Sequence, residues 1–425
     1  MIADLFKTQT HEGSRHARHY LAGLLSNCRR KNMERLAETL PDVQQQDLQH
    51  FITSSPWATA PVWTHVVQQA SRLLGGGRAQ MLVLDESGFA KKGDKSAGVA
   101  RQYNGRLGKI DNCQVGVFSA LVHETRATLT GARLYLPEAW TTDTERCESA
   151  GIPEAERVTR TKNELAWELI AEAAAAECDF DWVGMDAGYG RDQELLFKIA
   201  GLGKYFVADV DRDQLVWLSL PPGPQRPTSV SGSGARPVAE VAAEGWGQAR
   251  SLALRTAENG RLKVKFWRRR VWIWPPGSDV EIEVWLLVTE KPDGKMQYSL
   301  CNAPEELTWE ETAQRQGQRY FVERVFEEGK SQLGMGQYQV RQWAAWQHHM
   351  ALVGLAMLFT TAERAAQPGC GPWLSTRDVV EMLAWYFVKP RTAAALSEQI
   401  RERHARRQQA QASKLRRQAE TEIET

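Results

Sequence analysis

Two short apolar runs, each leading directly into an aspartate, constrain the fold more than any other feature of the chain. Residues 81–84 (MLVL) precede Asp85, and the segment FDWVGMDAGYG carries a second apolar run into Asp186. A short apolar run bounded by turn residues is typical of a buried strand. We therefore predict that each aspartate lies at the carboxyl end of a strand and that Gly88 ends the first of them.

The two aspartates are candidate site residues. Burying an unpaired carboxylate is costly, so a pair at strand ends indicates a shared site where cations or hydrogen bonds stabilise the negative charge. The alternative is that each is a turn residue, because aspartate before glycine is common in loops. The two residues by themselves leave both interpretations open.

The order of predicted elements between 76 and 208 gives the fold class. Further strands are predicted in CQVGVFSALVHE and ATLTGARLYLP, joined by a hairpin at 123–126, and in KYFVADV from Lys204. Helices are predicted after a capping box at Thr161 and Glu164 and around 194–199. This alternation predicts an α/β protein with a mixed sheet flanked by helices. Asp85 and Asp186 lie close together if the first and fourth strands are neighbours.

The first 75 residues and the last third of the chain are predicted to be helical. Residues 1–75 include a capping-box pattern at Asp42 and Gln45, and residues 311–390 include a second cap at Ser375 and Asp378. Basic side chains gather in the first region, at Arg15, Arg18, Arg29, Arg30, Lys31 and Arg35, and again in the tail at 391–425. Both clusters suit DNA binding, and both also fit an ordinary solvated face.

Residues 209–310 form a different kind of segment. Their Pro/Gly/Ser-rich part, 221–237, predicts a flexible loop, and the alternating pattern after it predicts a β-rich insertion. The insertion carries basic residues beside tryptophans: Lys263, Lys265, Arg268, Arg269 and Arg270 beside Trp267, Trp272 and Trp274. Such a mixture suits phosphate contacts and base stacking. The alternative is that the tryptophans form the core of a short sheet.

Composition excludes several other classes of protein. The formal net charge is +1, so any argument for nucleic acid depends on how the charges are distributed. The six cysteines form no CxxC pair and there is no histidine cluster at ligand spacing, so no zinc site is predicted. The first residues lack the apolar core of a signal peptide, and no apolar run is long enough for a membrane span. We predict a cytoplasmic protein with no membrane partner.

A third candidate acid lies in the segment RYFVERVFEEGK. Arg319, Glu323 and Lys330 are separated by four and seven residues, which places them on one face of a helix. Taken alone, this pattern is typical of a row of surface ion pairs.

Together these motifs resemble the DDE transposases of bacterial insertion sequences, which share the ribonuclease H-like fold. The resemblance depends on the strand order, on Asp85 and Asp186, and on the R-x3-E-x6-K spacing of Arg319, Glu323 and Lys330. The segments LDESGFAKKG, MDAGYG and LGMGQYQVRQWAAWQHH are most similar to the insertion sequence 701 group. The chain departs from the family signature at one position, where Gln316 replaces a tyrosine.

The resemblance implies a DNA transposase that cleaves the ends of its element and transfers the strand into target DNA. Three carboxylates can hold two divalent ions for an in-line displacement at phosphorus, so Asp85, Asp186 and Glu323 are expected to bind Mg²⁺, or Mn²⁺ as a substitute. Arg319 and Lys330 are expected to contact the DNA backbone. The expected partners are the inverted-repeat ends, the target DNA and a second copy of the chain in a homodimer, with the protein associated with the bacterial nucleoid when DNA-bound.

Two alternatives to a transposase remain open from the sequence. The first is a catalytically silent, captured sequence-specific DNA-binding protein. The second is a metal-dependent nuclease that cuts without strand transfer. The three acids argue against the first alternative. The long β-rich insertion and the extended basic helical ends of the chain argue against the second.

Overall fold

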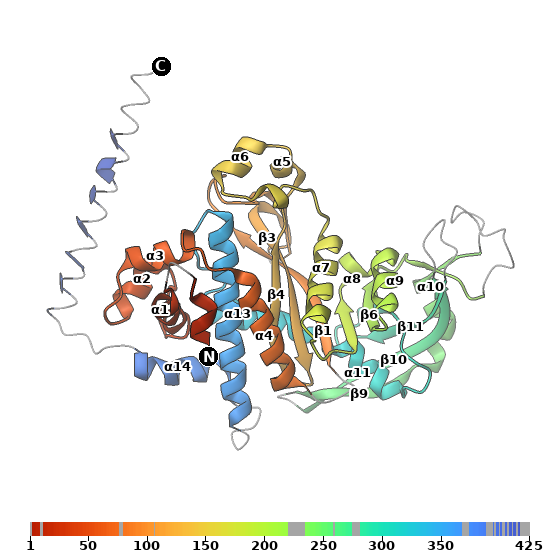
Figure 1. Cartoon of the computed structure of the whole chain (residues 1–425). Helices are drawn as coiled ribbons and strands as arrows, with labels where there is room; N and C mark the ends of the chain where they lie inside the picture. Colours follow the sequence, from red (N-terminus) through yellow and green to blue (C-terminus); the bar gives the residue numbers. More distant parts are fainter. Residues whose placement is uncertain are drawn as a thin grey trace.

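A mixed sheet, ten-stranded in the part of the chain described, runs through the centre of the computed structural model (Figure 1). The structure describes residues 2–8, 12–75, 80–105, 107–219, 234–257, 260–273, 281–367 and 374–387, with scattered positions between 394 and 416. Along the sheet the strand order is β2-β3-β1-β5-β6-β12-β11-β10-β9, with β4 also paired to β3. The predicted α/β fold with a large mixed sheet and flanking helices is confirmed.

The strands between residues 81 and 210 carry the residues of interest. They are β1 (Met81–Ala90), β2 (Ala100–Asn104), β3 (Lys109–His123), β4 (Arg126–Leu134), β5 (Trp182–Met185) and β6 (Tyr205–Val210). β1 pairs antiparallel with β3 and parallel with β5, and β5 pairs parallel with β6. The condition for bringing Asp85 and Asp186 together, that the first and fourth predicted strands are neighbours, is therefore met. The predicted β3–β4 hairpin, closed at His123 and Arg126, is confirmed.

Helices cover this part of the sheet. α7 (Lys162–Ala175) begins with the predicted capping box of Thr161 and Glu164 and packs against β3 and β4. The shorter helices nearby are α5 (Glu138–Thr141), α6 (Thr144–Ser149), α8 (Ala187–Gly190) and α9 (Gln193–Gly201). Residues 113–122 of β3 are buried without interruption. Because successive side chains of a strand point to opposite faces, both faces of the sheet are covered there.

The insertion continues the same sheet. Its strands are β9 (Arg250–Ala257), β10 (Gly260–Ile273), β11 (Ile282–Glu290) and β12 (Met296–Cys301). β12 pairs antiparallel with β6, so backbone hydrogen bonds run from the core strands into the insertion. α10 (Val238–Gly245) and α11 (Trp309–Gln318) lie beside these strands, and β7 (Leu215–Val216) pairs with β8 (Arg236–Pro237). Most of the predicted flexible loop at 221–237 lies outside the described residues.

The N-terminal helices pack against a long helix near the other end of the chain. They are α1 (Ser14–Leu24), α2 (Met33–Thr39), α3 (Gln45–Thr53) and α4 (Thr59–Leu74), and α13 (Trp343–Ala366) contacts α1, α3, α4 and β4. Figure 1 shows this group on the opposite side of the molecule from the insertion. α14 (Thr376–Phe387) also packs on α13 and begins with the predicted cap of Ser375 and Asp378.

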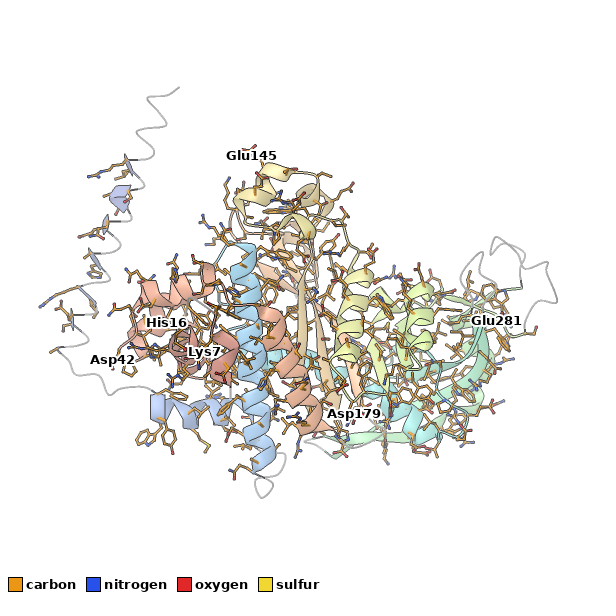
Figure 2. The ribbon with its side chains drawn as sticks, in the orientation of Figure 1. Lys7, His16, Asp42, Glu145, Asp179 and Glu281 are labelled. Atoms are coloured by element: carbon orange, nitrogen blue, oxygen red, sulfur yellow. The ribbon has the colours of Figure 1, made fainter. Side chains whose placement is uncertain are left out.

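Three local predictions, two in the N-terminal helical region and one in β1, are wrong. The N-cap of α3 is Gln44, whereas Asp42 adopts φ 55° at the outer edge of the helical region (Figure 2). Lys31 is not part of a basic rim, because it is buried and its Nζ donates to the backbone oxygens of Leu24 and Ser26. β1 does not end at Gly88 but continues to Ala90. A Cβ at position 88 would lie 2.6 Å from Asn104 Oδ1, so glycine admits the Asn104 side chain there.

Among the described residues, no helix is long and apolar enough to cross a membrane. Most of the predicted basic tail at 391–425 lies outside the described residues.

Candidate active site

Strand register places three aspartates at one level of the sheet. Leu84 of β1 is registered with Met185 of β5, and Met185 with Ala208 of β6. The next residue along each chain is an acid: Asp85, Asp186 and Asp209. The parallel strands therefore bring together the two predicted aspartates and add a third that the motif analysis did not include.

Asp85 lies within β1, at the point where the parallel pairing with β5 stops. Its side chain is 15 % exposed, and its Oδ1 accepts a hydrogen bond from the backbone N–H of Glu86 at 2.7 Å. Burial, with the neighbouring charge of Asp186, raises the pKa of Asp85 to about 7, and Arg319 opposes this rise. The negative charge at this position is thus only partly compensated by the protein.

Asp186 is fixed at the start of a helical turn. It is the N-cap of α8, and its Oδ1 accepts hydrogen bonds from the backbone N–H groups of Gly188 at 2.9 Å and Tyr189 at 3.4 Å. The glycine after the aspartate therefore belongs to a cap, which is the physical basis of the DAGYG pattern. The Tyr189 hydroxyl is buried near the acids and has no hydrogen-bond partner among the described residues.

Arg319 connects the acids. It lies where α11 ends and α12 (Tyr320–Ser331) begins, so the single helix predicted from the sequence is two helices. Its Nε donates to Asp209 Oδ2 at 3.0 Å. Its other two guanidinium nitrogens lie 3.8 Å from Asp85 Oδ2 and 3.7 Å from Glu323 Oε1. One guanidinium therefore has an acid at each of its three nitrogens.

Asp209 is the most extensively hydrogen-bonded acid of this group. Besides Arg319, it accepts hydrogen bonds from Gln297 Nε2, at 2.9 and 3.0 Å, and from Ser299 Oγ at 2.6 Å. The signal for Asp209 was present in KYFVADV, where an apolar strand again leads into an aspartate. Its partners lie about 90 residues away in the chain, so sequence spacing alone gave no reason to select it.

Glu323 is on the first turn of α12 and its side chain is 56 % exposed. It lines a groove of about 590 Å³ together with Arg319, Gln316 and residues of the insertion. Among the described residues, no group of three or more His, Cys, Asp or Glu side chains is arranged to hold a metal ion. The structure thus brings Asp85 and Asp186 together and places Glu323 at the same arginine, without forming a three-acid cage.

Lys330 lies farther along α12. Its Nζ is 5.3 Å from the centre of the Phe89 ring and 5.9 Å from that of Phe326. It lines a second hollow with the end of β1 and the segment around Gly336. The lysine therefore lies at the carboxyl end of the strand that carries Asp85.

The basic residues of the insertion are largely matched by acids. Lys265 pairs with Glu290 at 3.3 Å, Arg269 with Glu244 at 3.6 Å, and Arg270 with Glu305 at 3.1 Å. Arg268 donates to Thr312 Oγ1, and its guanidinium lies 4.4 Å from the centre of the Trp285 ring. Lys263 is exposed. DNA contact by these residues stays a prediction.

The tryptophans of the insertion differ in exposure. Trp267 is 3 % exposed, and a Cβ at Gly245 would lie 2.0 Å from its ring, so the two residues are in direct contact. This burial supports the interpretation that Trp267 belongs to the core, and it argues against base stacking. Trp272 is half-buried and forms a backbone bridge with Trp217, while Trp274 lies outside the described residues.

Comparison with known proteins identifies the family. A profile described as DDE superfamily endonuclease matches residues 4–271. The chain belongs to this superfamily. It is also 26 % identical over 327 residues to a probable transposase for insertion sequence element IS701 from Microchaete diplosiphon, covering 76 % of this chain and 75 % of that protein. The resemblance to insertion sequence 701-like DDE transposases is thereby confirmed.

Among solved structures, the chain is similar to piggyBac transposase in a synaptic complex with hairpin DNA. The sequence identity is 10 %, the TM-score is 0.42, and the match covers 93 % of this chain and 73 % of the other.

DDE endonucleases depend on a divalent cation, and the chemistry of the acids in this site fits that requirement. Asp85 and Asp186 supply hard oxygen ligands, and burial next to another acid raises the pKa of Asp85. Both features fit a divalent cation, which would relieve the repulsion between the two charges.

Proposed function

We propose that this DDE endonuclease binds the ends of an insertion sequence, cuts them, and transfers the freed 3′-hydroxyl into target DNA. The observation that supports it most is the register of β1 and β5, which brings Asp85 and Asp186 to one level beside Arg319. The relative named as a probable transposase supports the choice of substrate.

In this proposal Asp85 and Asp186 hold Mg²⁺, with Mn²⁺ as a substitute, and Glu323 completes a second site. When bound by these carboxylates, the ions would supply activation of the attacking hydroxyl and stabilisation of the leaving oxygen for an in-line displacement at phosphorus. Glu323 lies on a groove of about 590 Å³, so its carboxylate is accessible to an incoming strand. In this proposal, binding of the DNA strand moves the Glu323 carboxylate toward the two aspartates.

The chain's own cations orient the DNA. Arg319 faces the acids and offers donors whose geometry matches phosphate oxygens, and Lys330 lies in the last turn of α12, which begins directly after Arg319. Exposed Arg15 and Arg18 lie on α1, and exposed Arg29 and Arg30 lie between α1 and α2. With exposed Lys263 on the insertion, they provide candidate contacts to the end sequences. A homodimer would pair the two ends.

The test uses purified full-length protein and DNA fragments that span the two boundaries of the element, taken from the sequence flanking the reading frame. Wild-type protein with Mg²⁺ is expected to cut at the boundaries and to produce joined products with a target plasmid. Asp85→Ala is expected to bind the same fragments and leave them uncut.

The products separate the alternatives. Cleavage without joined products would favour a nuclease, and binding without cleavage by the wild type would favour a silent DNA-binding protein. Undiminished cleavage by Asp85→Ala would exclude the proposed mechanism.

A further inference from the structure

The guanidinium of Arg319 is a potential competitor of any cation at the acids. It is already positively charged, and two of its nitrogens lie 3.7 and 3.8 Å from Glu323 and Asp85. These distances exceed those of a direct charge-assisted hydrogen bond, which are about 2.7–2.9 Å. The arginine therefore stands beside these carboxylates without occupying their oxygens.

Asp209 explains why Arg319 stays at that distance. The contact from Arg319 Nε to Asp209 Oδ2 is 3.0 Å, the shortest of the arginine's three acid contacts among the described residues. Both groups are mostly buried, with side chains 18 % and 13 % exposed, so the attraction is weakly screened by solvent.

Asp209 is itself hydrogen-bonded to side chains of the neighbouring strand β12. Gln297 donates to both of its oxygens, and Ser299, its registered partner on β12, donates through Oγ. These donors stand on a strand that is hydrogen-bonded to β6. Arg319 is therefore paired with a carboxylate that is itself hydrogen-bonded to a neighbouring strand.

Gln316 extends this support. Its Nε2 donates to Ser299 Oγ at 2.7 Å, and its Oε1 accepts from Thr289 Oγ1. It is 4 % exposed, so these partners satisfy an amide that would otherwise be buried without hydrogen bonds. Gln316, at the position of the signature tyrosine, thus orients the Ser299 hydroxyl, which in turn donates to Asp209.

We propose that Asp209 is a positioning residue that holds the Arg319 guanidinium away from Asp85 and Glu323, so that their oxygens stay available to divalent cations. This inference rests on the proposed function. Without Asp209, the arginine loses its nearest acid, and its attraction to the remaining two draws it into direct contact with them. It would then neutralise the charge that the metal needs.

The test measures Mn²⁺ binding to the full-length protein by electron paramagnetic resonance, without DNA. Asp209→Asn keeps the shape of the side chain and removes its charge. We expect its Mn²⁺ affinity to fall about tenfold or more, the size typical of residues that support metal ligands. Arg319→Gln removes the competing cation, so the double variant is expected to return to the affinity of Arg319→Gln alone.

Three controls make the result decisive. Asp211→Asn removes a nearby acid that pairs with Arg191, and it is expected to bind Mn²⁺ like the wild type. Ser299→Ala, which weakens the anchor and keeps the Asp209 charge, is expected to lower the affinity by less than Asp209→Asn does. Thermal unfolding of each variant shows whether it is folded, and Ser299→Ala carries the test if Asp209→Asn is not.

An unchanged Mn²⁺ affinity in folded Asp209→Asn would overturn the proposal. So would an equal loss with and without Arg319, because Asp209 would then act as a ligand or as general support. Asp85→Ala distinguishes a failure of the proposed metal site from a failure of the proposed role of Asp209. If the wild type binds Mn²⁺ no better than Asp85→Ala, the proposed metal site fails and the role of Asp209 fails with it.

Discussion

Two regions of one continuous sheet differ in how their charges are paired: the acid end, which carries Asp85, Asp186 and Asp209 beside Glu323, and the insertion, which carries Lys265, Arg269 and Arg270. In the insertion, Lys265, Arg269 and Arg270 each lie within 4 Å of a glutamate. At the acid end, Asp85, Asp209 and Glu323 share Arg319 as their cation within 4 Å, as far as the structure is described. Charge is matched where it supports the fold, and it is left in excess where a cation is expected to bind.

The largest expected effect comes from removing one charge at the acid end. Asp186→Asn keeps the cap of α8, because asparagine is an equally good N-cap, and it removes a proposed metal ligand. We expect cleavage of end DNA to fall at least about a hundredfold because the metal loses a charged ligand. Asp192→Asn is the matched control, since Asp192 caps α9 in the same way and takes no part in the site. Equal loss in both variants would show that capping, and not charge, is measured.

The next effect tests whether Trp267 is structural. Trp267→Ala removes a buried side chain in contact with Gly245, and we expect it to lower the free energy of unfolding by about 3–5 kcal/mol. Urea unfolding followed by tryptophan fluorescence checks this value. Half-buried Trp272→Ala is expected to cost less. A folded, fully stable Trp267→Ala with weak DNA binding would restore the stacking interpretation.

The third prediction concerns the charge of Asp85, which the protein compensates only in part. Its pKa in the folded protein is about 7, above the ordinary value of 3.8, so the folded state binds the extra proton between these values. Stability from this group is therefore present at acid pH and lost as the pH rises through 7. We expect Asp85→Asn to be more stable than the wild type at pH 8, by no more than about 4 kcal/mol. The difference is expected to vanish near pH 4 in thermal unfolding.

Added Mg²⁺ sharpens the same measurement. It is expected to raise the melting temperature of the wild type at pH 8 and to leave that of Asp85→Asn nearly unchanged. If the free energy of unfolding of the wild type does not change between pH 4 and pH 8, the negative charge of Asp85 is paired as completely as the charges of the insertion.

The smallest effect is expected in the insertion. Lys265→Ala removes an exposed ion pair with Glu290, so we expect stability to change by less than about 0.5 kcal/mol. If Lys265 contacts phosphate, the slope of log affinity against log salt is expected to fall by about one. An unchanged salt slope would leave Lys265 as an ordinary surface residue.

Much of the fold was predictable because local and distant signals agree. Thr161 with Glu164 and Ser375 with Asp378 cap helices as their spacing indicates. Asp42 fails as a cap although its pattern is similar, because the chain turns there with positive φ and the helix begins after Gln44. Capping patterns thus predict a nearby helix start more reliably than its position.

The parts of the site that could not be predicted depend on distant contacts. β1 continues past Gly88 because β3 pairs with it to the end and the missing Cβ admits Asn104. The role of Asp209 depends on Gln297 and Ser299, which reach it only because β12 docks beside β6. Neither dependence has a local sequence signature.

The alignment of the aspartates across three strands also means that residue count matters as much as residue type. Side chains of a strand alternate between faces, so deleting one residue from 81–84 would slip the register and turn Asp85 to the other side of the sheet. An insertion sequence that is decaying by mutation would then carry an intact set of acids and still be inert. Among diverged copies of such a gene, the spacing before each aspartate is therefore the better indicator of which copies still move.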